Sequence, residues 1–325
     1  QAEDGIRDAT GGLVGSEMCI RDRLWTREED MQHGHYHPIT QCRLVGGLDD
    51  KGELVGLHVR ISGQSILASV NPKWMTGGVD MFTFQGMLPD GDHAISYTVP
   101  NLLVEHAMRN PPVPPGFWRG VNVNQNAIYM ESFMDELAHA AGKDPLEFRR
   151  TLMAKQPKAL AVLNAVAAKA DWGKPAANGV HRGLAVCKAF ASYVAACAEV
   201  SVDAKGRLKI HRIVAATDPG HAVNPQQIEA QVEGSFVYGL SALLYGECTI
   251  KDGAVEQSNF SDYPSMLIDD MPEVETIIMP SGGFWGGIGE PTIAVAAPAV
   301  LNAIFAATGK RVRRFPLKNV DLRGA

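Results

Sequence analysis

A glutamate follows directly on the most glycine-rich stretch of the sequence. Residues 281–291 read SGGFWGGIGEP, with five glycines in the eight residues 282–289 and Glu290 immediately after them. Glycine allows a backbone to adopt positive φ angles or to approach another group closely. We therefore expect one of two roles for Glu290. It is either a general base that faces a cleft lined by bare backbone, or a carboxylate that only stabilises the positive end of a helix.

Arg119 and Gln231 are two further polar residues whose setting suits a ligand. Arg119 stands in FWRG, directly after the proline-rich run PPVPPG, and a fixed guanidinium there suits an anionic or oxo ligand. Gln231 lies in the middle of an expected helix, on a face that we expect to be buried, where its amide needs hydrogen-bond partners. Each residue also has a purely structural interpretation. Arg119 would then form an ion pair, and Gln231 would bond to protein backbone.

Two patterns are typical of hydrolases but are incomplete. His33, His35 and His37 alternate, so along a strand they would share one face in a plausible zinc geometry. No downstream residue supplies an obvious fourth ligand. Ser241 follows Gly239-Leu240 but lacks the second glycine of a nucleophile elbow. A zinc hydrolase built on the three histidines stays a minor alternative, and a serine hydrolase a weaker one.

Strands and helices must place these residues, and their periodicity predicts both. We expect a hairpin over residues 39–63, strands over 183–190, 192–202 and 208–217, and short strands near 248–250 and 274–279. We expect helices over 126–141, from Pro145, over 157–170, from Pro225 and over 290–308. Residues 25–37 are predicted to be a strand end with a loop. This mixed order predicts the α+β class, with one region over residues 24–178 and a second over 179–325.

Composition excludes several classes of protein. The net charge is −6, so there is no basic field that would hold nucleic acid. The longest apolar stretch, residues 293–307, is interrupted by Pro298 and Asn302. It is too short to span a membrane, and we expect a soluble protein with a buried helix there. The five cysteines fall at no metal-ligand spacing, which argues against a structural zinc site or a disulfide framework.

The first 23 residues differ from the rest of the chain. They show no period that could bury a face and no secretory pattern. The fragments AEDGIRD and SEMCIRDR look like translated sequencing-adapter read-through. We therefore expect residues 1–23 to be a non-native, adapter-like segment, and the native N-terminus with any targeting signal to be missing. The choice between bacterial cytoplasm and periplasm stays open.

Four long segments, taken together and in order, resemble one known family. They are WTREEDMQHGHYHP at 25–38, PPGFWRGVNVNQNAIYMESFMDELAHAAGKDPLEFRR at 114–150, ATDPGHAVNPQQIEAQVEGSFVYGLSALLYGE at 216–247, and GGFWGGIGEPTIAVAAPAVLNAIFAATGKRVRRFPL at 282–317. These segments are similar to the molybdopterin-binding large subunit of the xanthine dehydrogenase/aldehyde oxidase family, and within it to the isoquinoline 1-oxidoreductase β-subunit type. The resemblance extends from about Leu24 to the C-terminus.

The resemblance implies a fold, a cofactor and a reaction. The fold would be the molybdenum-cofactor-binding fold of that family, in two incomplete subdomains. The cofactor would be molybdenum held by molybdopterin, usually as the cytosine dinucleotide in bacteria. The enzyme would oxidise an N-heteroaromatic ring or an aldehyde by inserting water-derived oxygen. Electrons would leave through an iron–sulfur small subunit that carries a [2Fe–2S] cluster, and from there to a downstream acceptor, since this chain has no cysteine cluster for one.

The resemblance also assigns residues. Glu290 matches the general base of the family. Trp118 replaces the phenylalanine of the family's Phe-Arg-Gly stretch, and Asn122 stands where a glycine is usual. The implied cofactor-binding residues are Trp118, Arg119, Gly120, Gln231, Gly287, Ile288 and Gly289.

Two motifs of the family are missing, namely Gly-Gly-Phe-Gly and Met-Gly-Gln-Gly. We therefore expect this chain to be a C-terminal fragment that cannot hold the cofactor tightly by itself and is inactive alone. The alternative from another class is a non-catalytic, cofactor-free remnant that acts only as an interaction module.

Overall fold

The computed structural model describes residues 24–324. These residues form two units: a smaller one of residues 24–34 and 248–263, and a larger one of the remaining residues. The predicted adapter-like segment, residues 1–23, lies outside the described residues. The predicted division into 24–178 and 179–325 stays a prediction.

The smaller unit contains a short helix and a two-stranded ribbon. Helix α1 spans Arg27–Gln32, and strands β7 (Ile250–Lys251) and β8 (Ala254–Val255) pair antiparallel. The prediction of a strand end with a loop over residues 25–37 was therefore wrong for residues 27–32, whereas residues 33–37 form a loop with an isolated β-bridge between Tyr36 and Pro115. Thr26 caps α1 by accepting a hydrogen bond from the Glu29 amide, and this Thr-x-x-Glu spacing is the capping signal that the prediction missed.

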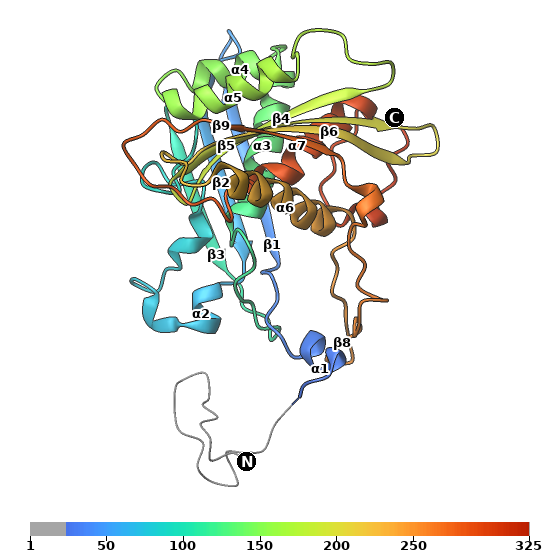
Figure 1. Cartoon of the computed structure of the whole chain (residues 1–325). Coiled ribbons are helices and arrows are strands. Elements are labelled where there is room, and N and C mark those ends of the chain that lie inside the picture. Colours follow the sequence, from blue (N-terminus) through green and yellow to red (C-terminus); the bar gives the residue numbers. More distant parts are fainter. Residues whose placement is uncertain (1–23, 325) are drawn as a thin grey trace. The chain divides into compact units, whose positions relative to one another are not determined.

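A four-stranded sheet lies at the centre of the larger unit, in the order β4-β5-β6-β9. The strands are β4 (His181–Ala189), β5 (Ser192–Val202), β6 (Leu208–Asp218) and β9 (Glu273–Ile278). Neighbours pair antiparallel except β6 and β9, which are parallel. The middles of β4, β5 and β6 are almost continuously buried, as expected for strands covered on both faces. Figure 1 shows helices above and below this sheet.

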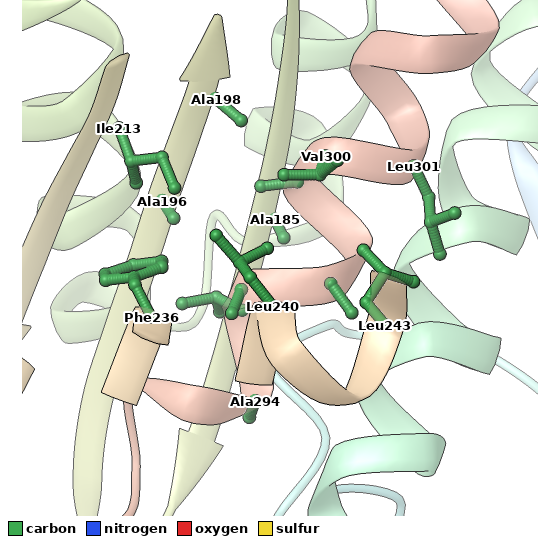
Figure 2. Packing of buried hydrophobic residues seen from close by; sticks show 14 of the residues in the cluster. Ala185, Ala196, Ala198, Ile213, Phe236, Leu240, Leu243, Ala294, Val300 and Leu301 are labelled. Atoms are coloured by element: carbon green, nitrogen blue, oxygen red, sulfur yellow. The ribbon is translucent and has the colours of Figure 1, made fainter. Parts of the chain in front are cut away.

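Helices α6 (Pro225–Leu244) and α7 (Ile293–Thr308) cover one face of the sheet. Figure 2 shows Phe236 and Leu240 of α6 packed beside the small side chains of Ala185 and Ala196. Gly183 permits the closest approach, since a Cβ there would lie 2.2 Å from the Ala303 amide nitrogen of α7. Small residues on the strands thus let α7 lie directly on the sheet.

On the other face α5 (Pro157–Lys169) lies against the sheet, and residues of α3 (Val123–Ala140) and α4 (Pro145–Leu152) complete the core on that side. Alternate residues of one strand face the two cores: Leu184 and Val186 belong to this core, whereas Ala185 and Cys187 belong to the core under α7. All three helices were predicted, although α3 begins three residues earlier than expected.

A second sheet of the larger unit has the order β1-β2-β3, with β1 (Thr40–Leu48), β2 (Leu54–Gly63) and β3 (Leu102–Met108). The predicted hairpin is β1 and β2, whose turn is closed by the Asp49 side chain, which accepts hydrogen bonds from the Lys51 and Glu53 amides. Shorter helical segments are α2 (Ile66–Val70) and the 3-10 turns Pro72–Trp74, Met81–Phe84, Ile268–Asp270 and Leu317–Asn319.

Helix α7 begins at Ile293 and not at Glu290, so this predicted boundary was wrong. Glu290 precedes Pro291, and a residue before proline is disfavoured in the helical region. Glu290 and Pro291 instead form a turn in which the Glu290 carbonyl accepts a hydrogen bond from the Ile293 amide at 3.2 Å. The mixture of helices and sheets confirms the predicted α+β class. Among residues 24–324, none of the helices has the length and apolar character needed to cross a membrane.

Candidate functional site

A strained turn over residues 118–121 carries Arg119. The Val121 amide donates to the Trp118 carbonyl at 2.7 Å, and the φ angles are +91° at Gly120 and +48° at Val121. A Cβ on Gly120 would lie 2.3 Å from Asn124 Oδ1 and 2.6 Å from Ile293 Cγ2. Glycine is therefore required here by both conformation and space. A β-branched residue such as Val121 at positive φ is rare and costs energy, and such strain concentrates at functional sites.

The guanidinium of Arg119 joins three segments that are distant in sequence. Its Nε donates to the Gly289 carbonyl at 2.6 Å, and one terminal nitrogen donates to Gln231 Oε1 and Ser235 Oγ, each at 3.0 Å. That nitrogen also reaches the Gln231 carbonyl at 3.1 Å. Burial lowers the pKa of Arg119, and the charge of Glu290 opposes this shift. The structure thus brings Arg119, Gln231 and the end of the glycine-rich loop together.

Glu290 lies against the same turn. Its Oε1 accepts a hydrogen bond from the Gly120 amide at 2.9 Å, and the side chain is half-buried. In the described part of the chain this is the one hydrogen bond that the carboxylate makes. Glu290 and Arg119 therefore flank Gly120, one bonded to its amide and the other preceding it in the chain.

Gln231 does not lie on a buried face, which corrects the sequence-based expectation. The buried stripe of α6 includes Ile228, Val232 and Phe236, and Gln231 lies outside this stripe and is exposed. Its amide oxygen nevertheless has a partner, the Arg119 guanidinium. Its amide nitrogen makes no hydrogen bond within residues 24–324 and stays available to a ligand.

The glycine-rich loop is held by the turn between β4 and β5, which sequence reasoning missed. The Gly287 amide donates to the Phe190 carbonyl at 2.8 Å, and the Ser192 hydroxyl donates to the Gly287 carbonyl at 2.5 Å. A Cβ on Gly286 would lie 2.2 Å from the Ser192 hydroxyl. Phe190 and Ser192 belong to the β4–β5 hairpin. Its apolar residues predict the two strands, but they do not predict that the turn between them contacts the glycine-rich loop.

Trp118 sits in an aromatic stack. Its ring lies parallel to that of Tyr238 on α6, with centroids 4.7 Å apart, and the His37 ring meets it edge-on at 5.4 Å. His37 Nε2 is 3.1 Å from the Val121 carbonyl oxygen. Burial lowers the pKa of His37, although its hydrogen bond to the Val121 carbonyl opposes the shift.

Gln85 and His93 extend the site on another side and were also missed. The Gln85 side-chain oxygen accepts from the Asn122 amide at 2.9 Å, and its nitrogen lies 3.4 Å from His93 Nε2. Burial lowers the pKa of His93, and the charges of Asp92 and Glu290 oppose this shift without reversing it. His93 is therefore a neutral group within electrostatic range of Glu290. Neither Gln85 nor His93 belongs to a sequence motif that would have indicated a functional role.

The three alternating histidines do not form a metal site. His33 Nδ1 is 3.0 Å from the Glu29 carbonyl, and His37 Nε2 is bonded to the Val121 carbonyl. From residue 24 to residue 324, no group of three His, Cys, Asp or Glu side chains could hold a metal ion. The zinc hydrolase alternative therefore has no set of ligands in this part of the chain.

The donors that converge here fit a large anionic group. Arg119 supplies a positive charge, and Gln231 supplies an exposed amide. Next to the strained turn, the buried Asn122 Nδ2 lacks a hydrogen-bond partner in the described residues. Such a set of donors suits the oxygen-rich and sulfur-rich surface of a pterin dithiolene cofactor and its phosphates.

Two family models match the chain. Residues 23–153 match one model described as "Molybdopterin cofactor-binding domain", and residues 119–272 match a second model with the same description. Both models include Arg119, and together they extend over more than half of the chain.

Curated relatives are similar over nearly all of the chain. The beta chain of the isoquinoline 1-oxidoreductase of Brevundimonas diminuta is 26% identical over 97% of this chain and 41% of that protein. One of the subunits of the nicotinate dehydrogenase of Pseudomonas putida is 27% identical over 100% of this chain and 29% of that protein. The membrane-bound aldehyde dehydrogenase of Gluconacetobacter polyoxogenes is 29% identical over 93% of this chain and 42% of that protein. The chain thus spans less than half the length of these relatives.

Solved structures share the fold. Quinoline 2-oxidoreductase from Pseudomonas putida 86 superposes with a TM-score of 0.69 at 14% identity, over 87% of this chain and 61% of that chain. The aldehyde oxidoreductase from Desulfovibrio gigas gives a TM-score of 0.69 at 14% identity, over 90% of this chain and 50% of that chain. At such identities the likeness concerns the fold alone.

Proposed function

We propose that this chain, which belongs to the xanthine dehydrogenase/aldehyde oxidase family of molybdopterin cofactor-binding proteins, provides part of the active site of a molybdenum hydroxylase. The membership confirms the resemblance found in the sequence, and the shared fold confirms the predicted one. One observation carries the functional proposal. Glu290, Arg119 and Gln231 come from three distant segments, and two hydrogen bonds connect them: the Gly120 amide binds Glu290, and the guanidinium of the preceding Arg119 binds Gln231.

The proposed cofactor is molybdenum–molybdopterin, in the cytosine dinucleotide form. Arg119, Gln231 and the loop residues Gly287, Ile288 and Gly289 would hold it, together with Trp118 and Gly120 of the strained turn. When bound, the molybdenum centre supplies the oxidising power and the activation of water. Arg119 would act mainly on cofactor binding, because it is already held rigidly by four acceptor atoms and needs no rearrangement to present its charge.

Glu290 is the proposed general base. The Gly120 amide holds Oε1, while Oε2 makes no hydrogen bond within residues 24–324, so it is free to accept a proton from the water whose oxygen enters the substrate. Pro291 and the turn into α7 restrict the backbone on the following side. A carboxylate held in this way can act within hydrogen-bond reach of a bound reactant.

The proposed substrate is an N-heteroaromatic ring or an aldehyde, the classes named in the relatives. The proposed partner is a separate iron–sulfur subunit with a [2Fe–2S] cluster, which passes electrons to a downstream acceptor. The described cysteines are consistent with this arrangement, since Cys187 and Cys197 are buried in the core and none is grouped with others as a cluster ligand.

A Glu290→Gln substitution in the assembled enzyme tests this proposal. We expect molybdenum content to stay at the wild-type level and kcat to fall by about 10²–10⁴-fold, the usual contribution of a general base. Glu233→Gln, an exposed position on α6, is the matched control and should leave both values unchanged. Turnover that survives Glu290→Gln within about twofold of wild type would reject the base role. A wild-type assembly without molybdenum would favour the non-catalytic remnant.

A further inference from the structure

His37 belongs to the histidine motif that forms no metal site, yet it lies beside the strained turn of residues 118–121. We propose that His37 is a positioning residue that holds Gly120 and Val121 in their left-handed conformation, and thereby holds the amide that binds Glu290. The importance of this for catalysis rests on the proposed function above. The positioning itself is a property of this chain and can be measured without cofactor.

The hydrogen bond of His37 fixes the state of its ring. A carbonyl oxygen can only accept, so Nε2, at 3.1 Å from the Val121 oxygen, must carry the proton. Burial holds the pKa of His37 below its usual value, so the ring is neutral at physiological pH and Nδ1 is unprotonated. The edge-on contact with Trp118 keeps the ring plane in place.

The hydrogen bond from His37 is made to Val121, the residue with the strained backbone conformation. Val121 has φ +48°, and its carbonyl accepts from His37 and, at 3.3 Å, from Asn124 Nδ2. If the turn relaxed to negative φ, the Gly120 amide would rotate away from Glu290. The hydrogen bond from His37 opposes this relaxation, because it is made only while the Val121 carbonyl keeps its present direction.

The backbone beside His37 is anchored to the same region. The Tyr36 amide donates to the Pro114 carbonyl at 3.0 Å, and the Gly116 amide donates to the Tyr36 carbonyl at 2.9 Å. His35 packs against Gly116, where a Cβ would lie 2.4 Å from the His35 Cβ. The segment before the turn thus places His37 at a fixed distance from it, and His35 has a packing role.

Two substitutions separate the hydrogen bond from the ring. His37→Phe keeps an aromatic ring against Trp118 but removes the donor, whereas His37→Gln keeps an N–H donor near the Nε2 position. Hydrogen exchange of the Gly120 amide, measured by NMR on this chain, should accelerate about tenfold or more in His37→Phe and stay near the wild-type rate in His37→Gln. The amide of Met134, in the interior of α3, serves as the internal reference and should not change.

Three further measurements make the test decisive. Glu290→Ala should also accelerate exchange at Gly120, and adding His37→Phe to it should have little further effect, because both act on one hydrogen bond. His211→Phe, which removes a histidine bond to Ser201 on the central sheet, should leave Gly120 unchanged. In wild type, ¹⁵N shifts of the His37 ring should report a protonated Nε2 and an unprotonated Nδ1 at neutral pH.

The proposal is overturned by any of three results. These are exchange at Gly120 that changes less than about twofold in His37→Phe, an equal acceleration at Met134, or an Nδ1-protonated ring. In the assembled enzyme, His37→Phe should lower kcat at constant KM and molybdenum content. If the wild-type assembly holds no molybdenum while the exchange results are as expected, the proposed function fails and the positioning role of His37 stands.

Discussion

Gly120 and Glu290 are 170 positions apart in the chain, and the amide of the first donates to the carboxylate of the second at 2.9 Å. A second hydrogen bond joins the same two segments, because the guanidinium of Arg119 donates to the carbonyl of Gly289. Gly120 follows Arg119 in the chain, and Glu290 follows Gly289. Two adjacent residues of one segment therefore bind two adjacent residues of the other. Such a double connection fixes both the distance and the orientation between a cation and a carboxylate.

Gly120→Ala should disrupt this connection. The new Cβ would lie within 2.6 Å of Asn124 and Ile293 at a φ of +91°, so we expect a loss of about 2–4 kcal/mol in the free energy of unfolding. Gly282→Ala is the matched control: its φ is also positive, at +73°, but its Cβ meets nothing within 4 Å. It should cost only about 1 kcal/mol. Urea unfolding of both variants gives the comparison, and equal losses would contradict the role of crowding at Gly120.

Arg119→Lys should be far from conservative. A lysine ammonium cannot reach the Gly289 carbonyl, Gln231 and Ser235 at once, as the guanidinium does. We expect about 1–3 kcal/mol of lost stability from acceptors left without a donor, together with reduced molybdenum content in the assembled enzyme. Arg109→Lys is the control, because within residues 24–324 the exposed Arg109 side chain bonds only to the neighbouring Met108 carbonyl. Retained metal content in Arg119→Lys would exclude Arg119 from cofactor binding.

A buried ion pair anchors α3, the helix that follows the strained turn. Glu131 on α3 accepts hydrogen bonds from Arg149 Nε and the Val186 amide, each at 3.1 Å, and from the Tyr97 hydroxyl at 2.5 Å. Both charged side chains are fully buried, at 1% and 0% exposure. This network joins α3, whose first turn follows Gly120, to α4 and to β4.

Arg149→Met should therefore be severe. It would leave the Glu131 carboxylate buried without its countercharge, at a cost of about 3–5 kcal/mol in the free energy of unfolding. Arg150, the next residue of α4, offers the control. Its pair with Glu147 is exposed, so Arg150→Met should cost within about 1 kcal/mol. Denaturant midpoints that are similar for the two variants would show that the buried pair is not needed.

The sequence predicted the elements better than the connections between them. The strands over residues 181–218 have long apolar runs, and α4, α5 and α6 have prolines in their first turn, so local chemistry identifies them. The start of α7 was predicted wrongly because the constraint of Pro291 on Glu290 was overlooked. Helix α1 was missed because its signal is a cap on a polar segment and not an apolar stripe.

The residues of the site could be selected, but their contacts could not. Arg119, Gln231 and Glu290 were chosen from local motifs and from the family resemblance, and the structure brings them together. The exposure of Gln231 depends on how α6 is rotated about its own axis against the sheet. The helical period of 3.6 residues leaves this rotation uncertain by one residue position. His37, Gln85 and His93 act through backbone groups far away in sequence, and nothing in their own neighbourhoods signals such bonds.

The stability of the chain should fall in acid partly through His37. Burial lowers its folded-state pKa below the unfolded value of about 6.5, so the unfolded chain binds the proton more readily. The stabilisation is therefore complete above about pH 6.5 and is lost as the pH falls toward the folded-state pKa. His37→Gln has no titrating group at this position. We expect the urea midpoint of wild type to exceed that of this variant, and this difference should become smaller as the pH falls from about 7.5 to about 5.5. The pKa values of His93 and His106 are lowered by burial as well. These two residues titrate in the same way in both proteins, so their effects cancel in the difference between the urea midpoints. A difference in urea midpoint that is constant or widens in acid would contradict a neutral, half-buried His37.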